Sequence, residues 1–386
     1  MTRITPDWLY NPAVAAVFSC LTAAGFQAYA VGGAVRNALL GRAASDVDIA
    51  TDATPEQVTE QAKAAGLRAL PTGIDHGTVT IVAAGTGIEV TTFRRDVETD
   101  GRRAVVAFAQ DLETDATRRD FTINALYLDP RGRIHDPVGG LRDLEARRVR
   151  FIGDAETRIR EDALRILRFF RFTAEIGGAA GIDPEGLAAS AELADLIDGL
   201  SAERIGAEMR KLLSTPDPAP AVASMGQSGI LMRILPGADP GALAPLIDAE
   251  GEYGPGWPRR LVALGGSLDR LRLSKAEGRR IAQIRAALDF DGGPAARGYL
   301  FGGDCAIDAQ LIARAAGIAP PPDWEAEIAR GATAILPVSA ADLMPPFQPG
   351  PALGAALKKA EAIWIASGFA LDRDRLIRKV TGNNAH

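Results

Sequence analysis

The apolar pattern of this chain changes near residue 145, and the change restricts the folds that the chain can adopt. Before that point, short apolar runs bounded by glycine predict strands at Tyr29–Val31, Val79–Val82 and Ile88–Phe93. Beyond it, apolar residues recur at helical spacing in residues 161–172, 188–197 and 202–213. We therefore predict an α+β protein in which a small mixed sheet with helices is followed by an all-helical remainder.

The length of 386 residues predicts several packed parts, because one hydrophobic core rarely serves so long a chain. We place the first part in residues 1–145, the second in 146–215 and the third in 216–386. The proline-rich run 216–220 marks the last boundary. Residues 94–117 are polar and charged, and we expect them to form a mobile loop.

The composition is that of a soluble globular protein, with 47% hydrophobic and 24% charged residues. No apolar run approaches the ~18 residues that a membrane span needs, and the start lacks a signal-peptide pattern, so we predict a cytoplasmic protein without membrane contact. The two cysteines, Cys20 and Cys305, are interpreted as small buried hydrophobes. Three scattered histidines are too few for a zinc site. A net charge of −6 argues mildly against nonspecific binding to nucleic acid.

The pair Asp46 and Asp48 is the strongest chemical signal. Residues 46–51 alternate polar and apolar, which predicts a half-buried strand with both carboxylates on one face and Val47 and Ile49 in the core. Two such carboxylates repel each other unless a cation lies between them, and Mg²⁺ prefers oxygen ligands. Glu89, in the following predicted hairpin, is a candidate third acid.

A double glycine precedes these acids. Gly32 and Gly33 lie between a predicted strand and a predicted helix at 34–40, where backbone N–H groups can approach a phosphate closely. Arg36, one turn into that helix, is expected to bind the same anion. A phosphate-binding turn followed by paired acids suits phosphoryl transfer assisted by two metal ions, a reaction that needs no nucleophilic serine, cysteine or histidine.

These residues resemble a known family. The runs Tyr29 to Arg36 and Ser45 to Thr51 are similar to the head of the class II tRNA nucleotidyltransferases and bacterial poly(A) polymerases, which belong to the polymerase-β-like superfamily. The resemblance implies a catalytic head in residues 1–145, a neck that selects the base in 146–215, and a body and tail that bind tRNA in 216–386. One departure is Asn37, where the family usually has aspartate, so an ion pair at that position is in doubt.

The run Arg118 to Leu126 resembles the second motif of this family, in which arginine and aspartate contact the triphosphate and ribose. We expect Arg119 to donate to phosphate and Asp120 to accept from sugar hydroxyls. The dipeptide His135-Asp136 does not indicate an HD phosphohydrolase, because that site needs several histidines.

Residues 161–172 carry the most specific match. On one helix, Asp162 and Arg165 would share a face, where Asp162 can accept the exocyclic amine of cytosine or adenine and Arg165 can donate to the ring. Guanine and uracil present carbonyls instead, so this pair can select C and A without a template. The resemblance implies the same role. Arg168 and Arg171 are expected to meet phosphate, and Ala163, Ile166, Leu167 and Phe170 to face the core.

The remaining matches are looser. Residues 202–213 resemble the helix that leads from neck to body, to which we assign a structural role. Lys358 and Lys359, on a predicted helix after Pro351, resemble the tail segment that grips the acceptor arm of tRNA.

Addition of CCA to the 3′ end of tRNA from CTP and ATP, with Mg²⁺ and without a protein partner, is therefore the predicted function. Poly(A) addition and A-only or CC-only addition remain alternatives. Residues 76–81, which begin with His76, resemble the tRNA enzymes more than the polymerases, and the long segment 94–117 argues against CC-only addition. A catalytically dead RNA-binding protein on the same scaffold is a further alternative, which the intact Asp46, Asp48, Arg119, Asp162 and Arg165 disfavour.

Overall fold

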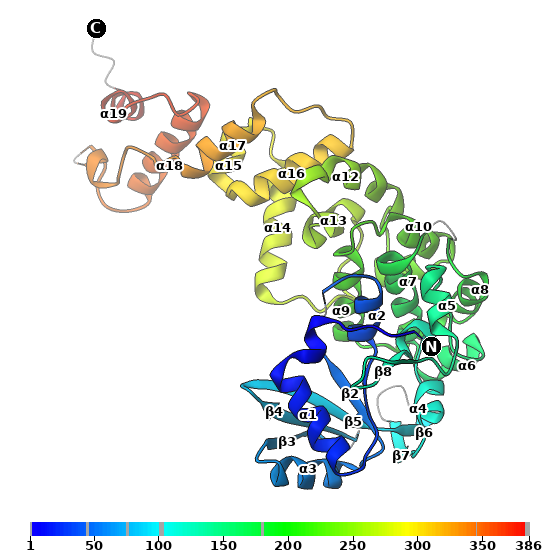
Figure 1. Cartoon of the computed structure of the whole chain (residues 1–386). Helices are drawn as coiled ribbons and strands as arrows, with labels where there is room; N and C mark the ends of the chain where they lie inside the picture. Colours follow the sequence, from blue (N-terminus) through cyan, green and yellow to red (C-terminus); the bar gives the residue numbers. More distant parts are fainter. Residues whose placement is uncertain are drawn as a thin grey trace. The chain divides into compact units, whose positions relative to one another are not determined.

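The computed structural model describes residues 2–43, 46–74, 77–99, 104–178, 181–344 and 346–382. Ser45 and His76, which were used above, lie outside these ranges. The chain forms two compact units (Figure 1). The first comprises Met1–Ala238 and Gly266–Arg272, and the second comprises Asp239–Gly265 and Leu273–His386. Residues 1–145 and 146–215 therefore fall within one unit, and the predicted three-part division stays a prediction.

A seven-stranded mixed sheet forms the centre of the first unit, with the strand order β3-β4-β5-β2-β1-β8-β9. All neighbouring strands are antiparallel except β2 and β5, which are parallel. The strands are β1 (Ala28–Val31), β2 (Asp48–Thr51), β3 (Arg68–Gly73), β4 (Thr78–Ala83), β5 (Thr86–Thr92), β8 (Tyr127–Leu128) and β9 (Ile134–His135). The predicted strand at 29–31 and the predicted hairpin at 79–93 are confirmed.

Two helices, α1 (Pro12–Ala23) and α3 (Pro55–Ala64), pack beside each other on one face of this sheet (Figure 1). Thr54 caps α3 because its hydroxyl accepts from the backbone N–H of Gln57, whose side chain accepts from the N–H of Thr54 in return. The opposite face carries a second core, which includes Val31, Ala50, Phe93, Leu112 and Tyr127.

The prediction of a loop at 94–117 is corrected by the structure. Its described residues form a two-stranded ladder, β6 (Arg94–Thr99) with β7 (Ala104–Phe108), and a short helix, α4 (Leu112–Thr117). The apolar run Ala104–Phe108 supplies a strand, and Asp111 caps the helix by accepting from the N–H of Thr114. The prediction relied on the polar composition of the segment and therefore missed both the ladder and the helix.

Helices follow in the rest of the first unit. They are α5 (Gly140–Glu145), α6 (Ala155–Glu161), α7 (Leu164–Ile176), α8 (Pro184–Glu192), α9 (Ala202–Leu213), α10 (Ala219–Gln227) and α11 (Ile230–Ile234). The predicted helix at 202–213 has the predicted bounds. The predicted helix at 161–172 is wrong at its start, because α6 ends at Glu161 and α7 begins at Leu164. The predicted helix at 188–197 is divided between α8 and a 3-10 helix at Ala194–Gly199.

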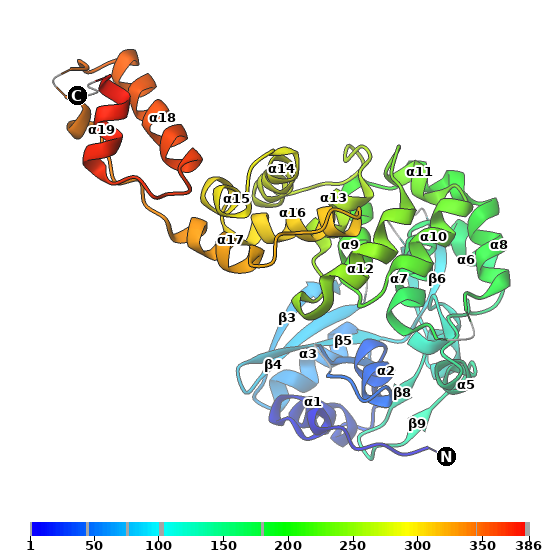
Figure 2. The same cartoon turned by 90° about the horizontal axis from the view of Figure 1, so that it is seen from above.

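In the described residues of the second unit, the regular elements are helices joined by loops. Its α-helices are α12 (Leu243–Glu250), α13 (Trp257–Leu264), α14 (Lys275–Asp289), α15 (Pro294–Phe301), α16 (Gly303–Ala315), α17 (Trp324–Thr333), α18 (Pro351–Ala366) and α19 (Arg373–Thr381). The last two pack together around Trp364, Leu376 and Val380 (Figure 2). Among the described residues, no helix has the length and apolar character to span a membrane.

Candidate active site

The three predicted acids lie around one cavity in the first unit. Ile49 of β2 is paired in parallel with Val90 of β5, and both are buried. Because side chains alternate along a strand, Asp48 and Glu89, one residue earlier in each strand, point to the other face of the sheet. Asp46, Asp48 and Glu89 line a cavity of about 450 Å³ together with Trp8, Asn11 and Thr86. The tertiary fold thus brings together acids that are about 40 residues apart in the sequence.

The predicted strand position of Asp46 is wrong. Strand β2 begins at Asp48, so Asp46 lies in the preceding segment, and Val47 is only half-buried and lines the same cavity. The shared cavity, rather than strand alternation, brings Asp46 near Asp48.

The surroundings of Asp48, which include repulsion by Glu89 and Asp46, disfavour its ionised form. Burial raises its pKa above the ordinary value, Glu89 and Asp46 raise it further, and Arg119 opposes them. A divalent cation would relieve this repulsion, and the carboxylate oxygens are the donors that Mg²⁺ prefers. In the described part of the chain, no group of three acid, histidine or cysteine side chains converges closely enough to form a complete metal site. The donor set therefore fits an ion that takes its other ligands from water and a substrate phosphate, as Mg²⁺ commonly does.

The glycine turn lies beside these acids, since Val31, just before the turn, is the pairing partner of Asp48. Gly32 joins β1 to α2 (Gly33–Leu39) with a φ of 74°, a conformation that favours glycine. A Cβ built on Gly32 would lie 3.9 Å from Nη1 of Arg119. The structure thus brings the predicted turn and the predicted phosphate-binding arginine together.

Arg119 is held by two groups that the sequence did not single out. Its Nε and Nη2 donate to Asp115 at 3.2 and 2.9 Å, and Nε also donates to the hydroxyl of Tyr127 at 3.0 Å. Asp115 precedes Arg119 by four residues, a helical spacing that could have indicated the pair. Tyr127 gave no such signal.

Asp120 is buried and its carboxylate contacts protein groups. It accepts from the N–H of Phe121, from the side-chain amide of Asn124 and from Arg168, whose Nη2 lies 2.6 Å away. Burial acts to raise the pKa of Asp120, but Arg168 and these hydrogen bonds outweigh it and the pKa is lowered. The described contacts favour a role in positioning Arg168, and the contact of Asp120 with ribose stays a prediction.

Arg36 and Arg171 contact protein acceptors, and Nη2 of Arg36 also lies 3.9 Å from the position of a Cβ on Gly33, so the predicted phosphate contacts of both arginines stay predictions. Both are buried: Arg36 donates to Asn124, Asn37 and Glu175, and Arg171 is paired with Glu175 and Glu208. The guanidinium groups of Arg36, Arg168 and Arg171 surround the ring of Phe172 at 4.8, 5.2 and 3.9 Å. Asn37 accepts a hydrogen bond from Arg36 at 3.2 Å, and Glu175 forms an ion pair with Arg36 at 3.3 Å. Burial lowers the pKa of Arg36.

The pair Asp162 and Arg165 is built differently from the prediction. Asp162 has an extended backbone between α6 and α7, and its carboxylate accepts from the N–H of Leu164 at 3.1 Å. This contact satisfies an amide at the start of α7, as aspartate commonly does. The other oxygen of Asp162 is 2.7 Å from Arg204 of α9, while Arg165 contacts Glu161 and the carbonyl of Arg118. Of the predicted core residues here, Ile166, Leu167 and Phe170 are buried and Ala163 is only half-buried.

Residues of α9 are the main feature that the sequence interpretation missed. Arg204 contacts Asp162, and Glu208 contacts both Arg171 and, at 4.0 Å, Arg168. The helix was assigned a structural role without naming these contacts. Their partners lie about 40 residues away, so no local spacing could have indicated them.

Other predicted residues have simpler surroundings. Lys358 and Lys359 are exposed on α18, and Lys359 donates to the carbonyl of Val380 at 3.5 Å. Asp136 accepts from the N–H groups of Gly140 and Leu141 at the start of α5, which is a structural contact.

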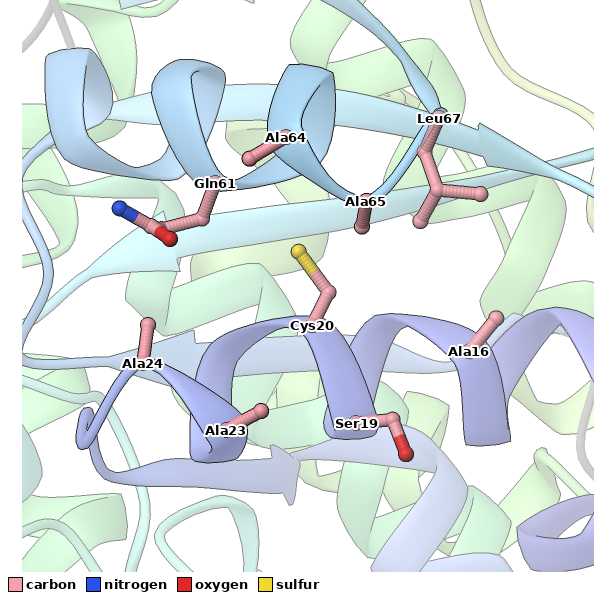
Figure 3. A pocket seen from close by; sticks show the side chains of 9 residues that line it. All are labelled: Ala16, Ser19, Cys20, Ala23, Ala24, Gln61, Ala64, Ala65 and Leu67. Atoms are coloured by element: carbon pink, nitrogen blue, oxygen red, sulfur yellow. The ribbon is translucent and has the colours of Figure 1, made fainter.

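Cys20 and Cys305 are buried, as predicted. Cys20 borders a cavity of about 480 Å³ between α1 and α3, where alanines form most of the wall (Figure 3). Burial raises the pKa of this thiol, which disfavours the reactive thiolate.

Comparison with known proteins defines the family. The model of the poly(A) polymerase head domain matches residues 28–150, and that of the probable RNA and SrmB-binding site of polymerase A matches residues 181–241. The crystal structure of the Bacillus stearothermophilus CCA-adding enzyme in complex with CTP is 31% identical, with a TM-score of 0.76. The alignment covers 99% of this chain and 98% of that one. This chain belongs to the class II CCA-adding enzyme family.

Curated relatives agree with this family. The CCA-adding enzyme of Geobacillus thermodenitrificans (strain NG80-2) is 44% identical over 215 residues, which are 55% of this chain and 52% of that one. The mitochondrial CCA tRNA nucleotidyltransferase 1 of Homo sapiens is 47% identical over 184 residues, 47% and 42% of the two chains. The chain thus spans about half the length of the curated relatives that it matches.

Proposed function

We propose that this protein adds CCA to the 3′ end of tRNA, using CTP and ATP and releasing pyrophosphate. The observation that carries the proposal is the cavity bordered by Asp46, Asp48 and Glu89, beside the Gly32 turn and Arg119. Family membership supports it, and the names of the relatives describe the same reaction in those proteins.

In the proposed reaction, the 3′-hydroxyl oxygen of the RNA attacks the α-phosphorus of the bound nucleotide in line with the departing pyrophosphate. Asp46 and Asp48, supported by Glu89, would hold Mg²⁺. Bound Mg²⁺ supplies positive charge that favours the attacking alkoxide and the leaving pyrophosphate. Arg119 and the backbone N–H groups at Gly32 and Gly33 orient the triphosphate, so that the reacting atoms are aligned before reaction.

Base selection is assigned to Asp162 and Arg165. The carboxylate of Asp162 accepts the exocyclic amine of cytosine or adenine, and a carbonyl at that position would leave it unpaired. The exposed fraction of the Asp162 side chain is 28%, and its contact with Arg204 can fix the carboxylate for this task. Arg36, Asp120, Arg168 and Arg171 stay assigned to nucleotide binding, and their contacts with protein groups would hold them in place for it.

The proposal also covers the parts of the chain and the conditions of the reaction. Catalysis is assigned to residues 1–145, base selection to 146–215 and tRNA binding, with Lys358 and Lys359, to 216–386. Magnesium is the proposed metal and the cytoplasm the proposed compartment. Activity with Mg²⁺, Mn²⁺ or Ca²⁺ supplied singly, and cell fractionation, test these two points.

The decisive experiment supplies Mg²⁺, a tRNA without its 3′-terminal CCA, and each nucleoside triphosphate singly, followed by CTP with ATP. We expect two C residues and then one A, after which addition stops. Long A tails would instead indicate a poly(A) polymerase, and a single class of product, CC or A, would indicate a partial enzyme. If no nucleotide is transferred under these conditions, the proposal is wrong and an RNA-binding protein becomes the better account.

A further inference from the structure

Arg119 is held from behind by a buried acid and a buried phenol. We propose that Asp115 and Tyr127 are positioning residues that fix the guanidinium of Arg119 for the triphosphate of the incoming nucleotide. This inference rests on the proposed function, because it assigns the ligand of Arg119 from that reaction. It adds two residues to the site that make no contact with the base.

The contacts join Asp115, Tyr127 and Arg119, and the other oxygen of Asp115 is paired with Arg118 at 2.6 Å. Asp115 and Tyr127 have exposed fractions of 1% and 0%. The Tyr127 hydroxyl donates to Asp115 at 2.8 Å and accepts from Nε of Arg119 at 3.0 Å, while Asp115 accepts from Nε and Nη2 of Arg119. The guanidinium also lies 5.3 Å from the centre of the Tyr127 ring. These contacts fix one edge and one face of the guanidinium.

The opposite side of the same group faces the predicted phosphate site. Nη1 of Arg119 lies 3.9 Å from the position of a Cβ on Gly32, at the turn before α2. The guanidinium thus lies between its buried supports and the glycine turn, where backbone N–H groups can approach a phosphate.

Charge explains why an acid serves as the support. Burial acts to raise the pKa of Asp115, but Arg119 and Arg118 lower it to about 2, so it stays ionised at neutral pH. An ionised, fully buried acceptor restricts the rotamers of a long side chain before the ligand arrives. The ordering of that side chain then no longer opposes nucleotide binding.

The test replaces Asp115 by Asn and Tyr127 by Phe, and measures nucleotide kinetics and the binding of inorganic tripolyphosphate by calorimetry. We expect Asp115→Asn to raise the KM for CTP and for ATP by about tenfold each, in parallel, and to weaken tripolyphosphate binding equally. Tyr127→Phe removes one hydroxyl and should raise the KM for CTP and for ATP by about threefold. The KM for tRNA and the preference for C and A should not change, because neither depends on the triphosphate.

Two comparisons separate positioning from a general loss of structure. Asp111→Ala removes the cap of α4, the helix that carries Asp115, and should lower the midpoint of thermal unfolding without weakening tripolyphosphate binding. In the background Arg119→Ala, the further change Asp115→Asn should have no added effect on nucleotide KM, because Asp115 acts through Arg119.

Unchanged nucleotide KM in Asp115→Asn, an additive loss in the double variant, or an equal loss of tripolyphosphate binding in Asp111→Ala would each overturn the inference. Calorimetry with tripolyphosphate needs neither RNA nor turnover. A wild-type protein that binds tripolyphosphate in this Asp115-dependent way but transfers no nucleotide would therefore reject the proposed function alone.

Discussion

Two groups of charged side chains in this protein are built in opposite ways. The carboxylate pocket, formed by Asp46, Asp48 and Glu89 in the first unit, gathers like charges around a cavity, and their repulsion contributes to the raised pKa of Asp48. The buried ionic cluster of the second unit consists of Glu250 on α12, Arg259 and Arg260 on α13, and Asp308 on α16. Each of its charges has an opposite partner, with separations of 2.6 to 2.8 Å.

The difference teaches how to distinguish a charge that binds a ligand from one that maintains the fold. In the buried ionic cluster, every residue is less than 9% exposed, and the partners lie within the same unit, so the charges hold helices together. Among the described residues, no ion pair of comparable distance is formed by the acids of the carboxylate pocket, and a cavity remains beside them. Unbalanced like charge beside a cavity is the arrangement that a metal and a phosphate can complete.

The largest effect is expected from removal of a carboxylate in the pocket. Asp48→Ala should lower nucleotide transfer by at least about 10³-fold, since several kcal/mol of transition-state stabilisation from the metal would be lost. Single-turnover transfer of labelled CMP to tRNA measures this loss. Circular dichroism and tRNA binding should remain near the wild-type values, and activity close to wild type would refute the assignment of Asp48.

Breaking the buried ionic cluster should affect stability instead. Glu250→Gln leaves Arg259 and Arg260 without their shared carboxylate and should cost about 3–5 kcal/mol of unfolding free energy. Urea unfolding followed by circular dichroism measures it. Glu252→Gln, at an exposed position nearby, is the matched control and should change stability by less than about 0.5 kcal/mol. Equal stability of the two variants would contradict the structural role of the cluster.

Asp162 lies between these extremes, because it is partly exposed and paired with Arg204. Asp162→Asn should increase the use of UTP and GTP relative to CTP and ATP by about tenfold or more, since an amide can donate to a carbonyl where a carboxylate cannot. Competition between paired nucleotides gives the ratio. Glu156→Gln, in an exposed ion pair on α6, serves as control and should leave the ratio unchanged. An unaltered ratio in Asp162→Asn would exclude the carboxylate from base selection.

The smallest effect concerns pH and metal-free stability. Because the pKa of Asp48 is raised in the folded state, the ionised form of Asp48 destabilises the fold. This loss of stability is absent below the unfolded pKa near 3.8, and it develops as pH rises through the folded pKa. Asp48→Asn should therefore melt slightly higher than wild type at pH 7 in chelator, and the gap should close near pH 3.5. Added Mg²⁺ should raise the melting temperature of wild type more than that of the variant. A gap that widens toward low pH would show that the sign is wrong.

Local features were predictable from the sequence to different degrees. Gly32-Gly33 predicted a strand-to-helix turn correctly, because backbone conformation depends on neighbouring residues. Asp162 broke its predicted helix for a related reason, since aspartate bonds readily to the amides that begin a helix. The strands within 94–117 were missed because the composition of one strand does not indicate which other strand it pairs with.

The sequence by itself determined the α+β architecture, the acids at Asp46 and Asp48, the glycine turn and the helix at 202–213, since each depends on residue type and short spacing. Only the tertiary structure decided which groups the arginines contact. Arg36 meets Glu175 across 139 positions, Arg168 meets Asp120 across 48 and Arg204 meets Asp162 across 42. A guanidinium binds a protein carboxylate or a ligand phosphate with the same donors. Which of them it meets depends on the groups that folding brings within about 3 Å, and no local pattern of residues records that distance.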